Sequence, residues 1–160
     1  MPDVVGTHDP DSPADADWRR RLEMFFFAYR DVTLEPDAIL AEYGFGRAHH
    51  RVIYFVGRRP GMTVSDLLGV LKITKQSLAR VLGQLVRDGF IHQRPGPRDR
   101  RQRLLDLTPL GIDLDRRLTA RQGERFARAL AEAGFEATAG FDRVLLALMD
   151  EAGRARFKAD

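Results

Sequence analysis

The chain has 160 residues, of which 44% are hydrophobic and 31% are charged, and its formal net charge is +3. This apolar content is sufficient for one globular core, and no apolar run approaches the roughly 18 residues that a membrane helix needs. The absence of cysteine excludes disulfides and thiol redox switches. With no signal-peptide pattern either, we expect a cytoplasmic protein that has no membrane partner.

Residues 1–17 are rich in proline and aspartate and almost devoid of apolar side chains, which predicts a disordered acidic tail. Residues 18–58 are expected to form N-terminal helices that serve dimerisation and support. One helix starts at Trp18, a short one runs from Pro36 to Tyr43, and Gly44 and Gly46 precede a third at about 47–57. The three successive phenylalanines 25–27 favour a subunit interface or a ligand pocket as well as a local core.

The histidines do not have the spacing of a metal site. His49 falls on the apolar side of its helix, and His50 points about 100° away because neighbouring helical positions diverge. We therefore expect a satisfied or interface histidine at position 49, and neither a metal nor a cofactor.

Two consecutive helix starts follow residue 59. Thr63 and Asp66 have capping-box spacing at the start of a short helix, and Thr74 is placed as the N-cap of a longer one over 74–88. The longer helix buries an apolar stripe, and its opposite stripe carries amides and unneutralised arginines, including Gln76, Arg80 and Gln84. A short helix, a tight turn and a longer basic helix have the order of a helix-turn-helix, whose second helix enters the DNA major groove.

A hairpin is predicted directly afterwards. Residues 90–94 and 102–107 have the pattern of two strands, and the loop 95–101 between them is rich in turn residues. By itself the run Arg98-Asp99-Arg100-Arg101 fits a solvated charged turn, but after a helix-turn-helix it favours a wing. The segment 72–103 holds nine Lys or Arg and two Asp, so the remainder of the chain is net negative. Such a concentration of positive charge is typical of a surface that binds a polyanion.

After the hairpin, Thr108 and Pro109 predict the start of a long helix that ends near Ala133. A last helix is expected over 141–149, before Gly153. Its apolar face and that of residues 18–32 would be exposed in a monomer, which favours a dimer.

Several of these motifs together resemble the winged helix-turn-helix of the MarR family of bacterial transcription regulators. The matching stretches are Leu85 to Ile91, Asp99-Arg100-Arg101 in the wing, Leu104 to Gly111, and Arg51-Val52-Ile53 before the domain. The resemblance implies a mainly α fold with a small β-hairpin wing (an α+β winged helix-turn-helix) and an intertwined helical dimerisation region from the N- and C-terminal helices. We expect the DNA-binding domain at 59–107 and the dimerising C-terminal helices at 108–160. Where the family usually has glycine the chain has Lys72, so either a left-handed residue there costs about 1 kcal/mol or the turn has another shape.

The leading hypothesis is therefore a homodimeric regulator that binds double-stranded DNA at a palindromic operator, with helix 74–88 in the major groove and wing 95–101 in the minor groove. The predicted DNA-binding residues are Thr74, Lys75, Gln76, Ser77, Arg80, Gln84, Arg98, Asp99, Arg100 and Arg101. The alternative is a winged-helix module that binds protein without reading DNA sequence. An enzyme is not expected, because P-loop, metalloprotease and nucleophile motifs are lacking. The resemblance also implies a small, often phenolic effector, for which the candidate residues are Phe25, Phe26, Tyr29, Tyr54 and Phe55; core packing is the competing role for them.

Overall fold

The computed structural model describes residues 13–157. The chain forms two units, of which the first ends at Leu118 and the second begins at Thr119. Most of the predicted acidic tail lies outside the described residues, but residues 13–17 are helical, so the tail prediction was too long at its C-terminal end.

The first helix is longer than the sequence suggested. Helix α1 (Pro13–Ala41) runs without interruption through Pro36, where we expected a new helix. An internal proline removes one backbone hydrogen bond and crowds the preceding turn. In the turn before it, the Thr33 hydroxyl donates to backbone carbonyls, 3.0 Å from the Tyr29 oxygen and 3.0 Å from the Arg30 oxygen. Pro36 and Leu40 are both buried. This burial offsets the cost of the proline, which a local sequence pattern does not reveal.

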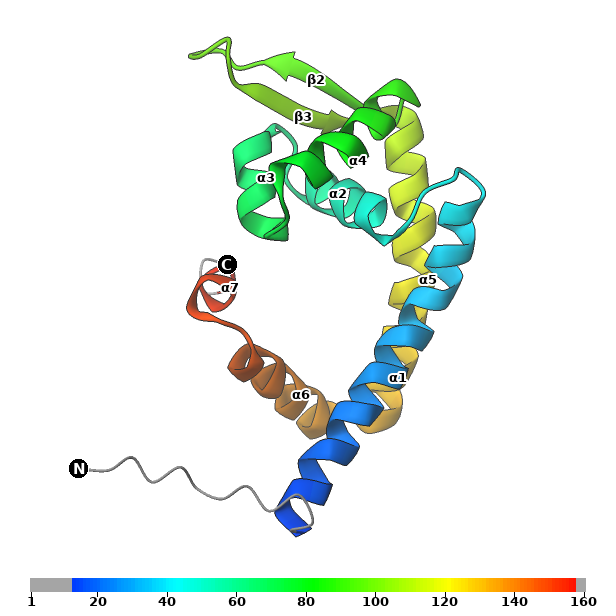
Figure 1. Ribbon diagram of the computed structural model, residues 1–160. Coiled ribbons are helices and arrows are strands. Elements are labelled where there is room, and N and C mark those ends of the chain that lie inside the picture. Colours follow the sequence, from blue (N-terminus) through cyan, green and yellow to red (C-terminus); the bar gives the residue numbers. More distant parts are fainter. Residues whose placement is uncertain (1–12, 158–160) are drawn as a thin grey trace, which may run out of the picture. The chain divides into compact units, whose positions relative to one another are not determined.

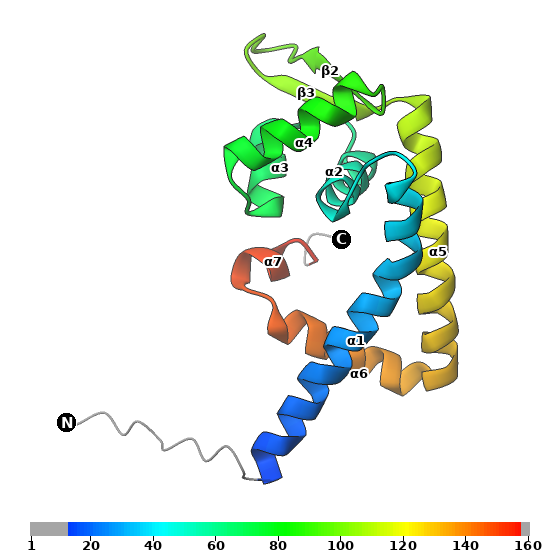
Figure 2. The same ribbon diagram turned by 45° about the vertical axis from the view of Figure 1, so that its right-hand side comes forward.

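A compact group of short elements follows α1. It consists of α2 (Arg47–Arg58), β1 (Met62–Thr63), α3 (Val64–Leu71), α4 (Lys75–Arg87), β2 (Ile91–Pro95) and β3 (Arg103–Leu107). The three strands form an antiparallel sheet in the order β1-β3-β2, in which Gln93 and Met62 both pair with Leu105. Figures 1 and 2 show the β2-β3 hairpin extending past α3 and α4, while the N-terminal part of α1 leads away from them. This is the mainly helical, winged arrangement that the sequence predicted.

The core of the described chain lies within this first unit. The apolar stripe predicted for α4 is buried, and the buried residues of α2 are His49, Val52, Ile53 and Val56. The buried apolar residues are Leu40, Phe45, Val52, Ile53, Val56, Met62, Leu67, Leu78, Val81, Leu82, Leu85, Phe90, Ile91, Leu105, Leu114 and Leu118. They come from α1, α2, α3, α4, all three strands and the start of α5 (Pro109–Ala133), so α4 and the hairpin rest on one shared core.

The second unit contains the end of α5, then α6 (Phe135–Leu148) and α7 (Glu151–Ala155). We expected one last helix to start at Phe141, but α6 starts six residues earlier and includes Gly140. The Asp150 carboxylate accepts from the Gly153 N–H at 2.7 Å and so caps a separate helix, α7. Neither α6 nor α7 has a buried residue among those described. In the described part of the chain, no helix is both long enough and apolar enough to cross a membrane.

Candidate nucleic-acid interface

The turn between α3 and α4 contains a left-handed residue, Lys72, at the position where glycine was the expected residue. Lys72 has φ 50° and ψ 39°, and its N–H donates to the Leu68 carbonyl at 2.9 Å. Of the two alternatives that the sequence left open, the strained backbone is therefore the one adopted. The neighbouring Leu71 and Ile73 pack against the core and hold the turn on both sides.

Helix α3 enters this turn with a well-defined start. The Thr63 hydroxyl accepts from the Asp66 N–H at 3.0 Å, and the Asp66 carboxylate accepts from the Thr63 N–H at 2.9 Å. The hydrogen bonds from Thr63 lower the pKa of Asp66 below its ordinary value, which keeps the carboxylate ionised at the positive end of the helix. The capping box predicted from the sequence is confirmed.

Helix α4 starts with a hydroxyl pair that faces solvent. The Thr74 Oγ1 atom accepts from the Ser77 N–H at 3.1 Å and donates to Ser77 Oγ at 2.9 Å. Lys75, Gln76 and Arg80 are exposed next to this pair. Among the residues that the structure describes, neither Lys75 nor Arg80 forms an ion pair. The start of α4 therefore presents hydroxyl, amide, ammonium and guanidinium groups together, which are the donors that contact phosphates and base edges.

Gln84 lies on the same stripe of α4 as Gln76 and Arg80, but its side chain contacts another part of the protein. Its Oε1 atom is 2.9 Å from Nε2 of His49 on α2, and the residue is partly buried. His49 in turn accepts at Nδ1 from the Gly46 N–H at 3.1 Å. The expected satisfied histidine is thus present, and Gln84 is engaged within the protein. The helical spacing of Gln84 correctly placed it beside Arg80 but could not reveal a partner 35 residues away.

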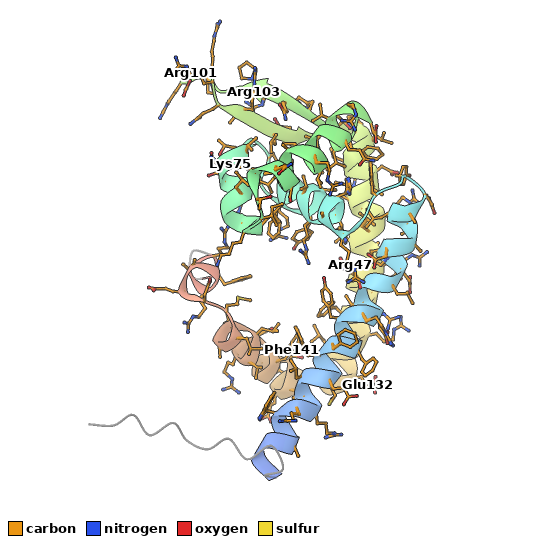
Figure 3. The ribbon with its side chains drawn as sticks, in the orientation of Figure 1. Arg47, Lys75, Arg101, Arg103, Glu132 and Phe141 are labelled. Atoms are coloured by element: carbon orange, nitrogen blue, oxygen red, sulfur yellow. The ribbon has the colours of Figure 1, made fainter. Side chains whose placement is uncertain are left out.

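The wing carries exposed arginines at its tip. Arg98, Arg100 and Arg101 are all exposed, and Figure 3 shows Arg101 at the end of the hairpin, pointing away from the helices. Asp99 acts on the backbone, because its Oδ1 accepts from the Arg101 N–H at 2.9 Å. The carboxylate of Asp99 therefore shapes the loop that carries Arg101.

Sequence reasoning missed an ion pair on the hairpin. Arg94 Nε donates to the Asp106 carboxylate at 2.7 Å across β2 and β3, and His92 Nε2 is 4.0 Å from the same carboxylate. Arg94 therefore contributes less positive charge to the wing than the arginines at the tip. The strand register could have indicated the ion pair. Asp106 lies directly opposite His92, so Arg94, two residues further along the same face of β2, is its diagonal neighbour.

The junction behind the hairpin fixes its base to α5. The Thr108 hydroxyl donates to the Gly89 carbonyl at 2.6 Å and accepts from the Gly111 N–H at 3.1 Å. A Cβ atom at Gly111 would lie 2.1 Å from the Phe90 carbonyl oxygen. Threonine caps α5 while holding the end of α4, and only glycine permits this close approach.

The residues predicted to line an effector pocket lie on two helices. Phe25 and Phe26 are exposed on α1, where Phe26 borders an open hollow together with Trp18 and Leu22. Tyr29 packs beside α2, with the Arg51 guanidinium 3.4 Å from its hydroxyl. Tyr54 and Phe55 form an edge-to-face pair on α2, and Phe55 also packs against the core. In residues 13–157, no group of three His, Cys, Asp or Glu side chains could hold a metal ion.

Comparisons with known proteins agree with this geometry. The MarR family profile matches residues 43–102. The HTH-type transcriptional regulator PetP of Rhodobacter capsulatus is 48% identical over 144 residues, which cover 90% of this chain and 87% of PetP. The structure of Streptococcus pneumoniae FabT in complex with DNA matches with a TM-score of 0.69 at 22% identity, over 82% of this chain and 94% of FabT. A crystal structure of MarR matches with a TM-score of 0.64 at 24% identity, over 94% of this chain and 97% of MarR. The chain belongs to the MarR family and is a DNA-binding transcriptional regulator, not an enzyme.

Proposed function

We propose that this regulator reads a specific, imperfectly palindromic operator as a homodimer, with α4 in the major groove and the wing in the adjacent minor groove. The observation that carries the proposal is the exposed start of α4, where Gln76 and Arg80 stand one turn apart beside Lys75. Glutamine and arginine suit bidentate contacts with adenine and guanine, and the first residues of a recognition helix are those that meet base edges. Two subunits would place two such helices about one helical turn of DNA apart.

Phosphate and base contacts are divided between different residues in this proposal. Lys75, Arg98 and Arg100 are exposed cations that would hold phosphates, and Arg101 at the wing tip would enter the minor groove. Thr74 and Ser77 would add hydroxyl contacts at the start of α4, and Asp99 would act indirectly by shaping the loop before Arg101. Gln84 is set apart from this group because its amide oxygen already contacts His49.

The homodimer is supported by apolar side chains that the single chain leaves exposed. On α1 these include Trp18 (45% exposed), Leu22 (59%) and Phe26 (61%). On α6 they include Val144 (57%) and Leu148 (72%). Exposed apolar faces of this kind mark interaction surfaces, and a second copy of each helix is the partner that we propose. A DNA-binding regulator acts where the DNA is, so we propose the cytoplasm as its location.

The test is a binding titration on DNA from upstream of the protein's own gene and on a scrambled duplex of the same length. Gln76→Ala should cost roughly 1 to 3 kcal/mol on the operator and leave the scrambled duplex almost unaffected. The matched control is Lys75→Ala on the neighbouring position, which should weaken both duplexes and reduce the log-log salt slope by about one. Equal losses on both duplexes for Gln76→Ala would contradict sequence reading and favour a module that meets an acidic protein partner.

We also propose that a small aromatic or phenolic molecule releases the DNA. The support is that both α1 and α2 carry aromatic rings and that Tyr29 of α1 contacts two arginines of α2. The Arg47 guanidinium carbon is 5.5 Å from the ring centroid of Tyr29, and the Arg51 guanidinium is 3.4 Å from its hydroxyl. Adding simple phenols to the operator titration tests this. Release by a phenol that Tyr29→Phe weakens would support the site, and indifference of the complex to all such compounds would contradict it.

A further inference from the structure

His49 is a buried polar side chain that bridges two helices. Its side chain belongs to α2 and is 6% exposed, and its ring stacks on Phe45 at 4.8 Å between centroids and 11° between planes. Phe45 also meets Phe90 edge to face at 5.0 Å, directly after the end of α4. The imidazole is therefore held in one orientation, with Nδ1 towards Gly46 and Nε2 towards Gln84.

The backbone of Gly46 determines which ring nitrogen carries the proton. A backbone N–H can only donate, so Nδ1 of His49, 3.1 Å away, has to be the unprotonated nitrogen. A neutral imidazole then carries its hydrogen on Nε2, which donates to Gln84 Oε1 at 2.9 Å. The orientation of the Gln84 amide follows, because a reversed amide would place two donors against each other. The three groups form a hydrogen-bond chain with one direction, from the N-terminus of α2 to the surface of α4.

The hydrogen bond between His49 and Gln84 restrains the rotation of α4 in a way that apolar packing does not. Helix α4 is attached to the core by its apolar stripe, which includes Leu78, Val81 and Leu85, and apolar burial is non-directional. A hydrogen bond weakens steeply when its angle falls below about 120°, so it resists rotation of α4 about its own axis. Gln84 lies two turns of helix beyond Gln76 and one beyond Arg80, on the same stripe. Any rotation that breaks the bond to His49 also moves the side chains that face DNA.

We propose that His49 is a positioning residue for DNA reading. Through its hydrogen bond to Gln84 it holds α4 in one rotational orientation. This proposal rests on the proposed function, in which α4 reads the operator. It also changes the role predicted for Gln84. Bidentate recognition of adenine needs both the oxygen and the nitrogen of the amide, and the Gln84 oxygen is already used by His49.

The experiment uses the full-length protein and four variants. His49→Asn places an amide oxygen near the position of Nδ1, which keeps the cap on Gly46 but removes the donor to Gln84. Gln84→Ala removes the acceptor, and the variant that combines His49→Asn with Gln84→Ala completes a double-mutant cycle. His49→Gln is the conservative variant, since glutamine at the third helical position can accept from the N-cap N–H and can still donate from its amide nitrogen.

On the operator, His49→Asn and Gln84→Ala should each weaken binding by about fivefold, the size expected for losing one hydrogen bond. The double variant should lose no more than either single variant, because both remove the same link. His49→Gln should recover most of the affinity. Binding to a scrambled duplex and the salt slope should stay as in the parent, since no phosphate contact has been removed.

Parental affinity of both single variants, additive losses in the double variant, or equal losses on the scrambled duplex would overturn the proposal. Nitrogen NMR of the His49 ring in the DNA-free parent tests the hydrogen-bond chain itself: the proton should be on Nε2, and a proton on Nδ1 would overturn the chain. If His49→Asn fails to fold, the operator affinity of Gln84→Ala alone tests the proposal. Loss of operator selectivity in the parent would reject the proposed function, while the ring tautomer would still test the link.

Discussion

The region from Leu40 to Leu118 buries many of its apolar side chains, whereas the helices after Thr119 leave theirs largely exposed. In the first region, the end of α1, helices α2 to α4, the three strands and the start of α5 bury one another, and the hydrophobic core of the described part of the chain lies there. In the second, Phe135 is 89% exposed and Leu148 is 72% exposed. The first region therefore buries its apolar side chains within one chain, whereas the exposed apolar side chains of the second support the proposed dimer.

The largest expected change in stability comes from replacing glycine with alanine in α5. This helix has one glycine, Gly111, before the boundary at Leu118 and another, Gly123, after it. At Gly111 a Cβ atom would lie 2.1 Å from the backbone oxygen of Phe90, so Gly111→Ala should lower the free energy of unfolding by roughly 3 kcal/mol or more. At Gly123 a Cβ atom meets no described atom within 4 Å, so Gly123→Ala should raise it by about 0.5 to 1 kcal/mol. Urea unfolding measures both. Similar effects at the two sites would erase the contrast, and a large loss at Gly123 would place it in the subunit interface.

The next effect concerns the exposed face of α6. Val144 is 57% exposed, and if a second copy covers it, Val144→Glu would bury a charge without a partner. The dimer should dissociate at least tenfold more readily, which corresponds to about 1.4 kcal/mol or more. Light scattering across a dilution series gives the mass, and circular dichroism should still report a folded chain. The control is Arg143→Gln on the adjacent, exposed position, which should leave the mass unchanged; a dimer that tolerates Val144→Glu would remove α6 from the proposed interface.

The contrast also explains what could be predicted from the sequence. The starts of α3, α4 and α5 are set by Thr63, Thr74 and Thr108, whose partners lie three residues ahead, so these caps were predicted correctly. The hairpin strands were found from local alternation and turn residues. The residues that would contact DNA are exposed on these locally defined elements, which made them accessible to sequence reasoning.

Features that depend on distant partners could not be predicted in the same way. The path of α1 through Pro36 depends on burial of that turn, and the hydrogen bond between His49 and Gln84 joins side chains 35 residues apart. Strand β1 has only two residues, too few for an alternation pattern, and exists because Met62 and Thr63 pair with β3. For α6, the predicted start at Phe141 left out Gly140, which lies inside the helix although glycine weakens isolated helices.

A smaller effect is expected at Lys72, where the first region carries a strained residue. Its left-handed backbone, with φ 50°, is unfavourable for any residue with a Cβ atom. Lys72→Gly should raise the free energy of unfolding by about 0.5 to 1 kcal/mol, partly reduced by the greater freedom of glycine in the unfolded chain. Lys72→Ala keeps the strain while removing the long side chain, so it serves as the control and should bring no gain. A glycine variant no more stable than the alanine variant would show that the turn is not strained.

The smallest effect is a pH dependence that should belong to the first region alone, because residues 119–157 contain no histidine. Burial lowers the pKa of His50 on α2 below its ordinary value of 6.5; Arg51 acts in the same direction, and Asp37 opposes them. A folded chain with a lowered histidine pKa binds its proton less readily than the unfolded chain does. The stability that neutral His50 contributes is therefore fully present above about pH 6.5 and is lost as the pH falls through the lower folded value. Measured by urea unfolding between about pH 7 and pH 5, the parent should lose more stability than His50→Gln, whose side chain does not titrate. Equal losses in the two proteins would show that protonation of this partly buried imidazole does not drive the acid sensitivity of the first region.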